Sequence, residues 1–260
     1  YVFHAAAYKH VPMLEYHPVT AVINNILGTK IITDLCYEFE VPKLLIVSSD
    51  KAVNPSNIMG ASKRIAEIYS SKNFKNNSVT KVVTTRFGNV LGSSGSVVPI
   101  FKKQILNGGP VKVTHPEIIR YFMTIAEASL LVLESAVLGN KSEIFVFDMG
   151  KPVKILDLAI NMIQLAGFQA GRDIEIKFTG LRPGEKLFEE LLTSSEKLQK
   201  SHNEKIFIAN KEIFNPDKFN QIEELINLAL NNAKNDLIVE HMKKIIPEFK
   251  SLNSPYSKFD

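Results

Sequence analysis

Short, uninterrupted apolar runs alternate with amphipathic segments along most of this chain. The central run, residues 44–47, shows no polar alternation, which is typical of a parallel strand covered by helices on both faces. Further predicted strands cover residues 1–3, 81–87, 111–114, 143–147, 174–178 and 206–208.

Between these strands, apolar residues recur at the spacing of a helix. The predicted helices cover 21–39, 97–106, 125–138, 155–166, 187–192, 220–231 and 236–246, and another begins near Met59. Thr124 and Glu127 form a capping box at one helix start. Gly28 lies inside another helix, where glycine costs about 1 kcal/mol, so we expect a close packing contact to compensate. Strands that alternate with helices predict an α/β fold.

Polar side chains follow the central run directly, as Ser48-Ser49-Asp50-Lys51. Open α/β sheets bind ligands outside the carboxyl ends of their strands, so a carboxylate and an amine at this position favour a reactive site. Asp50 and Lys51 are adjacent on a strand end, and we expect them to point to different sides. An arbitrary acid–amine pair is more often an exposed ion pair, but the end of a buried strand reverses that preference.

Composition narrows the function classes. The 260 residues are 45% hydrophobic and 22% charged, which is ordinary for a globular protein. The net charge of +4 includes no basic stripe, so we expect no nucleic-acid partner. The six histidines show no metal-ligand spacing, and Cys36 is interpreted as a core residue in a reducing compartment. The chain begins at Tyr1, inside a predicted strand, and we interpret it as part of a longer protein.

Several motifs together resemble the extended short-chain dehydrogenase/reductase superfamily. They are His4-Ala5-Ala6-Ala7, Asn25 with Gly28-Thr29, Ser48-Ser49-Asp50-Lys51, and Lys63. A narrower resemblance is to the bacterial UDP-N-acetylglucosamine 4,6-dehydratases of polysaccharide and glycoprotein-sugar biosynthesis. It lies in six ordered motifs, at residues 8–12, 50–55, 59–64, 86–92, 120–124 and 182–186. Each motif alone is weak, but six in the right order are specific, and the resemblance extends from Tyr1 to about Leu192.

The resemblance implies a Rossmann-like parallel sheet with a smaller C-terminal α/β substrate-binding region. Residues 1–90 would form the second half of the dinucleotide-binding domain. Residues 91–260 would mainly bind the nucleotide sugar, with 143–148 returning a strand to the sheet. The glycine-rich unit that opens such domains is absent from this sequence, which corresponds to three βα units or roughly 100 residues.

The family also implies a setting for the protein. Transmembrane helices are expected upstream, which would make this the cytoplasmic catalytic domain of a bacterial inner-membrane protein. A homo-oligomer is expected. NAD is the expected cofactor, and NADP stays open because the discriminating residue would lie in the absent half.

Met59 departs from most of the superfamily, which has a tyrosine four residues before the helix lysine. A thioether cannot exchange a proton, so Met59 cannot replace that phenol. The methionine matches a subgroup of the dehydratases and so supports the narrower resemblance.

The implied reaction transfers hydride from C4 of UDP-N-acetylglucosamine to NAD, eliminates water across C5 and C6, and returns hydride to C6. Asp50 would be the acid at C6, which requires burial that keeps it protonated near neutral pH. Lys51 would be the base at C5, which requires a lowered pKa. Ser49 would hydrogen-bond the C4 oxygen. The C4 base stays open, with Asp50 acting through a water as the first candidate.

The remaining implied contacts are divided between cofactor and substrate. The expected cofactor contacts are His4, Ala5, Ala6, Asn25, Ser48, Lys63 and Arg86, with Lys63 on the nicotinamide ribose. The expected substrate contacts are Lys9, Asn89, Ser96, Arg120, Arg182 and Glu185. Individually, each arginine is more often a solvated charge, and His4 is more often a packing residue.

Three alternatives stay open. A C5-inverting dehydratase shares all these motifs, although the methionine subgroup mostly resembles the retaining kind. A nucleotide-sugar 4-epimerase shares the fold and cofactor, but needs no acid at C6. A chain without the pyrophosphate loop could also be a non-catalytic fragment.

Overall fold

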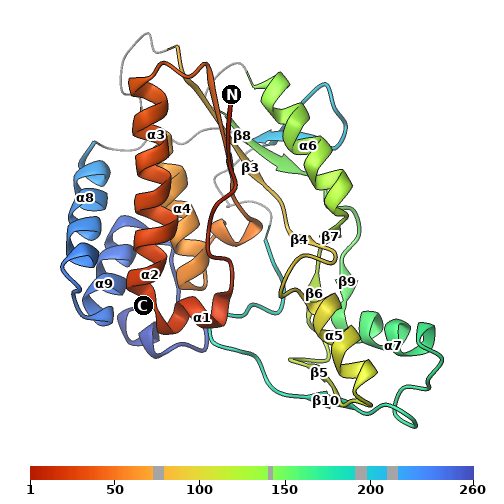
Figure 1. Cartoon of the computed structure of the whole chain (residues 1–260). Coiled ribbons are helices and arrows are strands. Elements are labelled where there is room, and N and C mark those ends of the chain that lie inside the picture. The colour runs from red at the N-terminus through yellow and green to blue at the C-terminus, as the bar shows by residue number, and fades with distance from the viewer. Residues whose placement is uncertain (73–78, 140–142, 191–197, 210–215) are drawn as a thin grey trace.

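A central sheet organises the computed structural model, which describes residues 1–72, 79–139, 143–190, 198–209 and 216–260 (Figure 1). The sheet has the strand order β1-β2-β3-β8-β12-β11. These strands are β1 (Val2–His4), β2 (Lys43–Val47), β3 (Lys81–Arg86), β8 (Glu143–Phe147), β12 (Ile206–Ala209) and β11 (Leu198–Lys200). The first four are parallel, and β12 and β11 extend the sheet antiparallel. The predicted α/β, Rossmann-like class is confirmed.

The alternation of side chains along β2 explains its uninterrupted apolar sequence. Leu44 and Ile46 join a cluster with Cys36 and Val82 on one face. Leu45 packs with Val83, Phe145 and Phe147 in a different cluster. Because successive side chains of a strand point to opposite faces, a strand covered on both sides needs apolar residues at every position.

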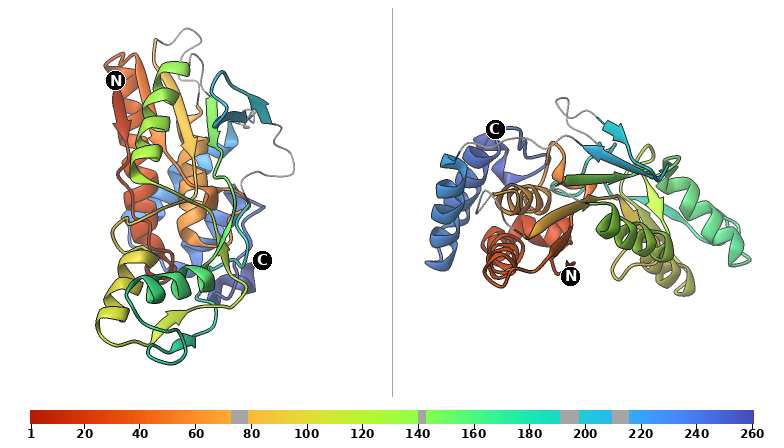
Figure 2. Two further views of the ribbon diagram at one scale, coloured as in Figure 1. Left: turned by 90° about the vertical axis from the view of Figure 1, so that its right-hand side faces the viewer. Right: turned by 90° about the horizontal axis from the view of Figure 1, so that it is seen from above.

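Helices cover both faces of this sheet (Figures 1 and 2). α3 (Gly28–Glu38) and α4 (Ile58–Ser70) lie on one face, and α6 (Ile125–Leu138) lies on the other. Thr124 caps α6 as expected, because its side chain accepts a hydrogen bond from the backbone N–H of Glu127.

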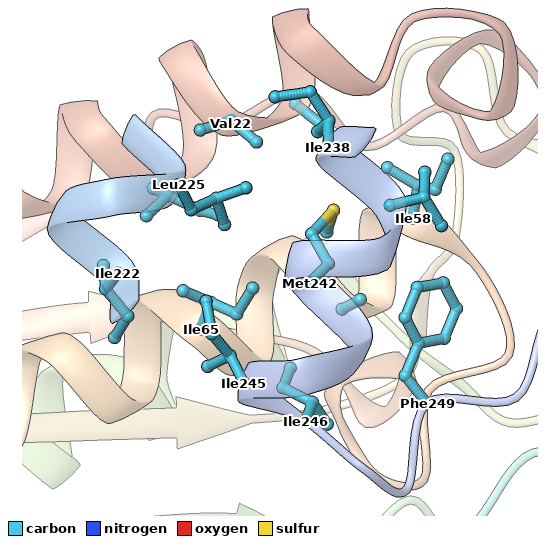
Figure 3. Packing of buried hydrophobic residues seen from close by; sticks show 14 of the residues in the cluster. Val22, Ile58, Ile65, Ile222, Leu225, Ile238, Met242, Ile245, Ile246 and Phe249 are labelled. Carbon is cyan, nitrogen blue, oxygen red and sulfur yellow. The ribbon is translucent and has the colours of Figure 1, made fainter. Parts of the chain in front are cut away.

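The C-terminal helices form a further layer outside α4. α8 (Asp217–Leu230) and α9 (Asn235–Ile245) join α4 in one apolar cluster. Figure 3 shows Ile65 of α4 facing Ile222 and Leu225 of α8 and Ile245 of α9. The last two helices within residues 91–260 thus pack on the first part of the chain, and the predicted division of the chain into domains stays a prediction.

The predicted helix over 21–39 is divided. α2 (Pro18–Ala21) leads into a π-helical segment, η1 (Val22–Leu27), and then into α3. A side chain at Gly28 would meet nothing nearer than the carbonyl oxygen of Ile23 at 4.0 Å. The expected close contact at Gly28 is therefore wrong. π-Helical turns are often found at functional sites, and this one contains Asn25.

A second lobe lies beyond the carboxyl ends of the parallel strands (Figure 1). It contains α5 (Val97–Leu106), α7 (Ile155–Leu165) and the pair β5 (Val111–Val113) and β10 (Ile176–Phe178), with its own apolar core. Two further pairs connect the lobes: β4 (Asn89–Val90) with β7 (Phe122–Met123), and β6 (Ile119–Arg120) with β9 (Val153–Lys154).

Short elements complete the fold: α1 (Val11–Tyr16), η2 (Asp50–Ala52) and η3 (Pro255–Phe259). The predicted helix over 187–192 is wrong for residues 187–190, which are not helical, and residues 191 and 192 lie outside the described part. None of the helices described is both long and apolar enough to cross a membrane.

Candidate active site

A tight turn follows β2 at the carboxyl edge of the sheet. Ser49 begins the 3₁₀ turn η2, and its Oγ accepts a hydrogen bond from the backbone N–H of Lys51 at 3.2 Å. η2 packs directly on the start of α4. A Cβ at Gly60 would lie 2.1 Å from the carbonyl oxygen of Lys51, so only glycine allows this approach.

Asp50 and Lys51 lie against each other in this turn. Lys51 Nζ donates to Asp50 Oδ1 at 3.0 Å, and Ser49 Oγ donates to the same oxygen at 2.8 Å. The prediction that the pair points to different sides is wrong, because the strand geometry ends at Ser49 and a 3₁₀ turn replaces it.

The second oxygen of Asp50 is free. Asp50 is 2% exposed, and its Oδ2 is buried with no hydrogen-bond partner among the described residues. A Cβ at Gly88 would lie 3.1 Å from Oδ2, so the missing side chain at Gly88 keeps space beside this oxygen. A buried acceptor without a partner is costly, and it identifies a position where a ligand group could bind.

Lys51 has two more partners besides Asp50. Its Nζ lies 3.4 Å from Glu189 Oε1 and 3.4 Å from Asn89 Oδ1. Burial disfavours the ammonium, but the carboxylates of Asp50 and Glu189 outweigh burial and raise the pKa of Lys51. The expected lowering of the Lys51 pKa is therefore wrong for this arrangement.

Arg120 binds its own chain instead of standing free for a phosphate. Its guanidinium donates to the carbonyl oxygens of Lys186 at 2.8 Å and Leu187 at 3.2 Å. It also lies 3.6 Å from Glu185 Oε1 and 3.5 Å from Glu189 Oε1. These partners hold the guanidinium within its own chain, and a substrate contact of Arg120 stays a prediction.

Lys63 lies buried on α4, near the end of β1. Lys63 is only 5% exposed. Burial lowers the pKa of Lys63 to about 8, although the carboxylate of Glu67 acts in the opposite direction. Burial and the charge of Lys63 also lower the pKa of His4, whose Nε2 lies 3.0 Å from Thr29 Oγ1.

Asn25 fastens the segment after β1 to α4. Its Oδ1 accepts from the backbone N–H of Tyr8 at 2.8 Å, and its Nδ2 donates to Ser62 Oγ at 2.9 Å. Its side chain therefore orders the neighbourhood of Lys63. Met59 is buried in the apolar cluster of α4, α8 and α9, as its chemistry leads one to expect.

Arg86 and Ser48, both predicted to contact the cofactor, belong to a buried network. Arg86 donates from Nε and from an amino group to Glu67, at 2.9 and 2.7 Å, and Ser48 Oγ donates to the same carboxylate at 2.5 Å. Burial opposes the charge, but Arg86, Arg64 and Ser48 lower the pKa of Glu67 to about 2. In this arrangement both side chains bind Glu67, and their contact with the cofactor stays a prediction.

The other predicted contacts surround the site without joining it. Lys9 Nζ donates to Ser93 Oγ at 3.2 Å, and Ser96 precedes α5 with a buried Oγ that has no partner in the described part. Arg182 is exposed and pairs with Glu185 Oε1 at 3.1 Å. Ala5 and Ala6 are exposed at the end of β1. No cluster suited to a metal ion occurs in the ranges that the structure describes.

Glu189 and Glu67 were missed by the sequence reasoning. Glu67 follows Lys63 by one helical turn, so a helical projection places it on the same face. Glu189 comes three residues after Lys186, at the end of a recognised motif. The only sequence signal for Glu189 was an acidic side chain three positions after a motif that we expected to contact the substrate.

Comparison with known proteins shows the family to which this chain belongs. The profile of the family described as "Polysaccharide biosynthesis protein" matches residues 1–211. The capsular polysaccharide biosynthesis protein CapD of Staphylococcus aureus is 55% identical over 227 residues, covering 87% of this chain and 38% of CapD. The probable polysaccharide biosynthesis protein EpsC of Bacillus subtilis is also 55% identical, over 79% of this chain and 33% of EpsC. The chain thus spans about a third of the length of these relatives.

Two further likenesses concern the fold and an alternative activity. The X-ray structure of Pen from Bacillus thuringiensis is 34% identical with a TM-score of 0.74, covering 89% of this chain and 75% of Pen. A UDP-glucose 4-epimerase of Rickettsia rickettsii is 37% identical over 198 residues, covering 75% of this chain and 57% of the epimerase.

Proposed function

The chain belongs to the polysaccharide biosynthesis protein family, and on that premise we propose that the complete protein is a UDP-N-acetylglucosamine 4,6-dehydratase. Its product would be a UDP-linked 4-keto-6-deoxy sugar for polysaccharide or glycoprotein-glycan synthesis. One observation carries the proposal: a buried carboxylate and an amine lie together at the carboxyl end of β2, with one carboxylate oxygen left without a partner.

The residues near the end of β1 fit a nicotinamide cofactor. The amine of Lys63 lies close enough to His4 to lower its pKa, and an ammonium there can donate to the hydroxyls of a ribose. Ala5 and Ala6 are small and exposed, so a flat ring can approach the backbone there. Bound NAD would take a hydride from C4 of the sugar and return it to C6.

Asp50 can act both as the base at the C4 hydroxyl and as the acid at the C6 hydroxyl. Its free Oδ2 would accept the proton of the C4 hydroxyl as C4 is oxidised. The same oxygen would then give this proton to the C6 hydroxyl, which leaves as water. The two proton transfers balance, because the net reaction moves one proton from the C4 hydroxyl to the departing water. Asp50 thus supplies the C4 base that Met59 cannot.

Lys51 would exchange the proton at C5. Its amine, when neutral, would take the C5 proton, and the electron pair of the C5–H bond would form the double bond to C6 as water leaves. The ammonium would return the proton to C5 after reduction at C6. Because a single amine removes and returns this proton, we expect retention at C5. The upstream membrane anchor, the cytoplasmic location and the homo-oligomer stay predictions.

Substitution of the pair tests this function. In the complete protein, Asp50→Asn and Lys51→Ala should each lower formation of the 4-keto-6-deoxy product by on the order of 10²–10⁴-fold, as expected for loss of a general acid or base. Binding of the UDP-sugar should persist. The product is measured by NMR, and turnover of either variant near the wild-type rate would refute these roles.

A 4-epimerase is the second candidate, favoured by the similarity to the rickettsial UDP-glucose 4-epimerase. Epimerisation needs no acid at C6, so it does not require the Asp50–Lys51 pair. NMR of the product formed from UDP-N-acetylglucosamine separates the two, because only dehydration converts the C6 hydroxymethyl into a methyl group.

A further inference from the structure

One carboxylate joins Lys51 to Arg120. Glu189 Oε1 lies 3.4 Å from Lys51 Nζ and 3.5 Å from Arg120 Nε, and the Glu189 side chain is only 5% exposed. A buried carboxylate between two cations is a strong constraint, because removing it takes away a counter-charge that both cations share in a poorly solvated place. Glu189 therefore holds both the proposed C5 base and an arginine from the second lobe.

The position of Glu189 is fixed by contacts of the residues just before it. Arg120 donates to the carbonyl oxygens of Lys186 and Leu187, just before Glu189. Lys186 Nζ donates to the carbonyl oxygen of Asn54 at 2.8 Å, in the loop that follows η2. The non-helical course of residues 186–189 thus brings the carboxylate to η2.

Lys51 needs a second anion for a chemical reason. Asp50 is the nearest anion, but in the proposed reaction Asp50 gains and loses a proton, so its charge changes during turnover. Glu189 is not assigned any proton transfer to the sugar. A carboxylate with constant charge can orient the amine of Lys51 while the charge of Asp50 changes.

We propose that Glu189 is a positioning residue that orients the amine of Lys51 toward C5. This inference rests on the proposed dehydratase function. The charged groups that face Lys51 are Asp50, Glu189 and Arg120, and Lys186 also faces Glu189. Of the two carboxylates, only Glu189 can be neutralised without removing the proposed acid.

The step that depends on Glu189 is exchange of the C5 proton. The C5–H bond breaks, its proton goes to the neutral amine of Lys51, and its electron pair forms the C5–C6 double bond as the C6–O bond breaks. The hydroxyl leaves with the proton from Asp50. Oxidation at C4 precedes this step and does not use Lys51, so loss of Glu189 should spare it.

The test compares Glu189→Gln, Glu189→Asp and Glu190→Gln in the complete protein. Glu190 is the matched control, since it is adjacent in sequence and its side chain is 48% exposed. Glu189→Gln should lower kcat for the 4-keto-6-deoxy product by on the order of tenfold to a hundredfold, the effect of a misplaced group. KM should stay within about threefold, and oxidation at C4, followed by NADH absorbance, should be retained.

The pH dependence gives a readout that a merely structural role would not move. Loss of an anion beside Lys51 lowers the pKa of its amine, so the limb of the kcat profile that rises with pH should shift to lower pH in Glu189→Gln. Glu189→Asp keeps the charge and should keep the wild-type limb. Glu190→Gln should match the wild type in rate and profile. An unchanged profile in Glu189→Gln, or an equal loss in Glu190→Gln, overturns the proposal.

A second measurement separates this inference from the proposed function. The acetylation rate of Lys51 with acetic anhydride, followed against pH by mass spectrometry, reports the titration of its amine without any substrate. If the wild type forms no 4-keto-6-deoxy product, the dehydratase proposal fails. The amine of Lys51 should still titrate at lower pH in Glu189→Gln, and an identical titration in both proteins would refute the role of Glu189.

Discussion

Two buried lysines within 12 residues of each other have opposite electrostatic environments. Lys51 lies between two carboxylates, which raise its pKa. Lys63 has only Glu67 to oppose the cost of burial, and its pKa falls to about 8. Residue type and burial alone do not decide protonation, because the number of nearby anions reverses the direction of the shift.

We predict that Lys63→Met stabilises the protein while removing cofactor binding. The folded-state pKa of about 8 lies below the model-compound value of 10.5, so the unfolded chain binds more protons between these values. The charged amine thus costs stability below pH 8, and the cost disappears as pH rises through 10.5. Urea unfolding at pH 7 should show a gain of about 1–3 kcal/mol over the wild type.

The same comparison at high pH provides the control. At pH 10.5 the advantage of Lys63→Met should shrink toward zero, since Lys63 is then deprotonated in the folded state and half deprotonated in the unfolded state. A gain that is independent of pH would assign the effect to packing instead of charge.

At the scale of the element, α4 carries residues of the site and also anchors the site to the rest of the fold. Its outer face packs on α8 and α9, and its start packs against η2. Glu67, farther along α4, holds Arg86 of β3 and Ser48 at the end of β2. The ion pair therefore fixes α4 to the two strands whose ends carry the site.

We predict that Glu67→Gln destabilises the protein by about 3–5 kcal/mol, because it removes the charge of a buried carboxylate that pairs with Arg86. The pKa of Glu67 is lowered from 4.5 to about 2, so its stabilisation is complete above pH 4.5 and is lost as pH falls through 2. Urea unfolding at pH 7 and pH 2.5 measures both effects, and the variant should depend less on pH across this window.

Glu117→Gln is the matched control, since Glu117 pairs with Lys154 on the surface and its side chain is 60% exposed. Surface ion pairs contribute about 0–1 kcal/mol, so this variant should unfold almost like the wild type. Equal losses in both variants would contradict the special role of the buried pair.

The sequence predicted the elements better than the contacts between them. Periodicity identifies β2, α6 and α7, because burial on one or both faces leaves a repeating pattern. The pairing of Asp50 with Lys51 depends on a 3₁₀ turn that no period reveals. The contact between Lys51 and Glu189 joins residues far apart in the chain, and a single sequence carries no signal for such a pair.

At the scale of the whole molecule, the C-terminal segment supports the site from behind. The family profile ends at residue 211, yet α8 and α9 cover the outer face of α4. Glu15 makes a second link: its Oε1 accepts from the backbone N–H of Ile58 at 2.7 Å and its Oε2 accepts from Ser254 Oγ at 2.7 Å. The start of α4 is thus tied to the end of the chain.

We predict that Met242→Ala destabilises the whole protein, because α9 and α4 share one core. Met242 is fully buried in the cluster that also contains Ile58 and Ile65 of α4 (Figure 3). Truncation of such a side chain costs about 2–5 kcal/mol. Unfolding followed by circular dichroism should remain one transition at lower urea.

Met13→Ala, at an exposed methionine, should change stability by less than about 0.5 kcal/mol. If α8 and α9 instead folded as a separate unit, Met242→Ala would produce a second, early transition and leave the main one unchanged.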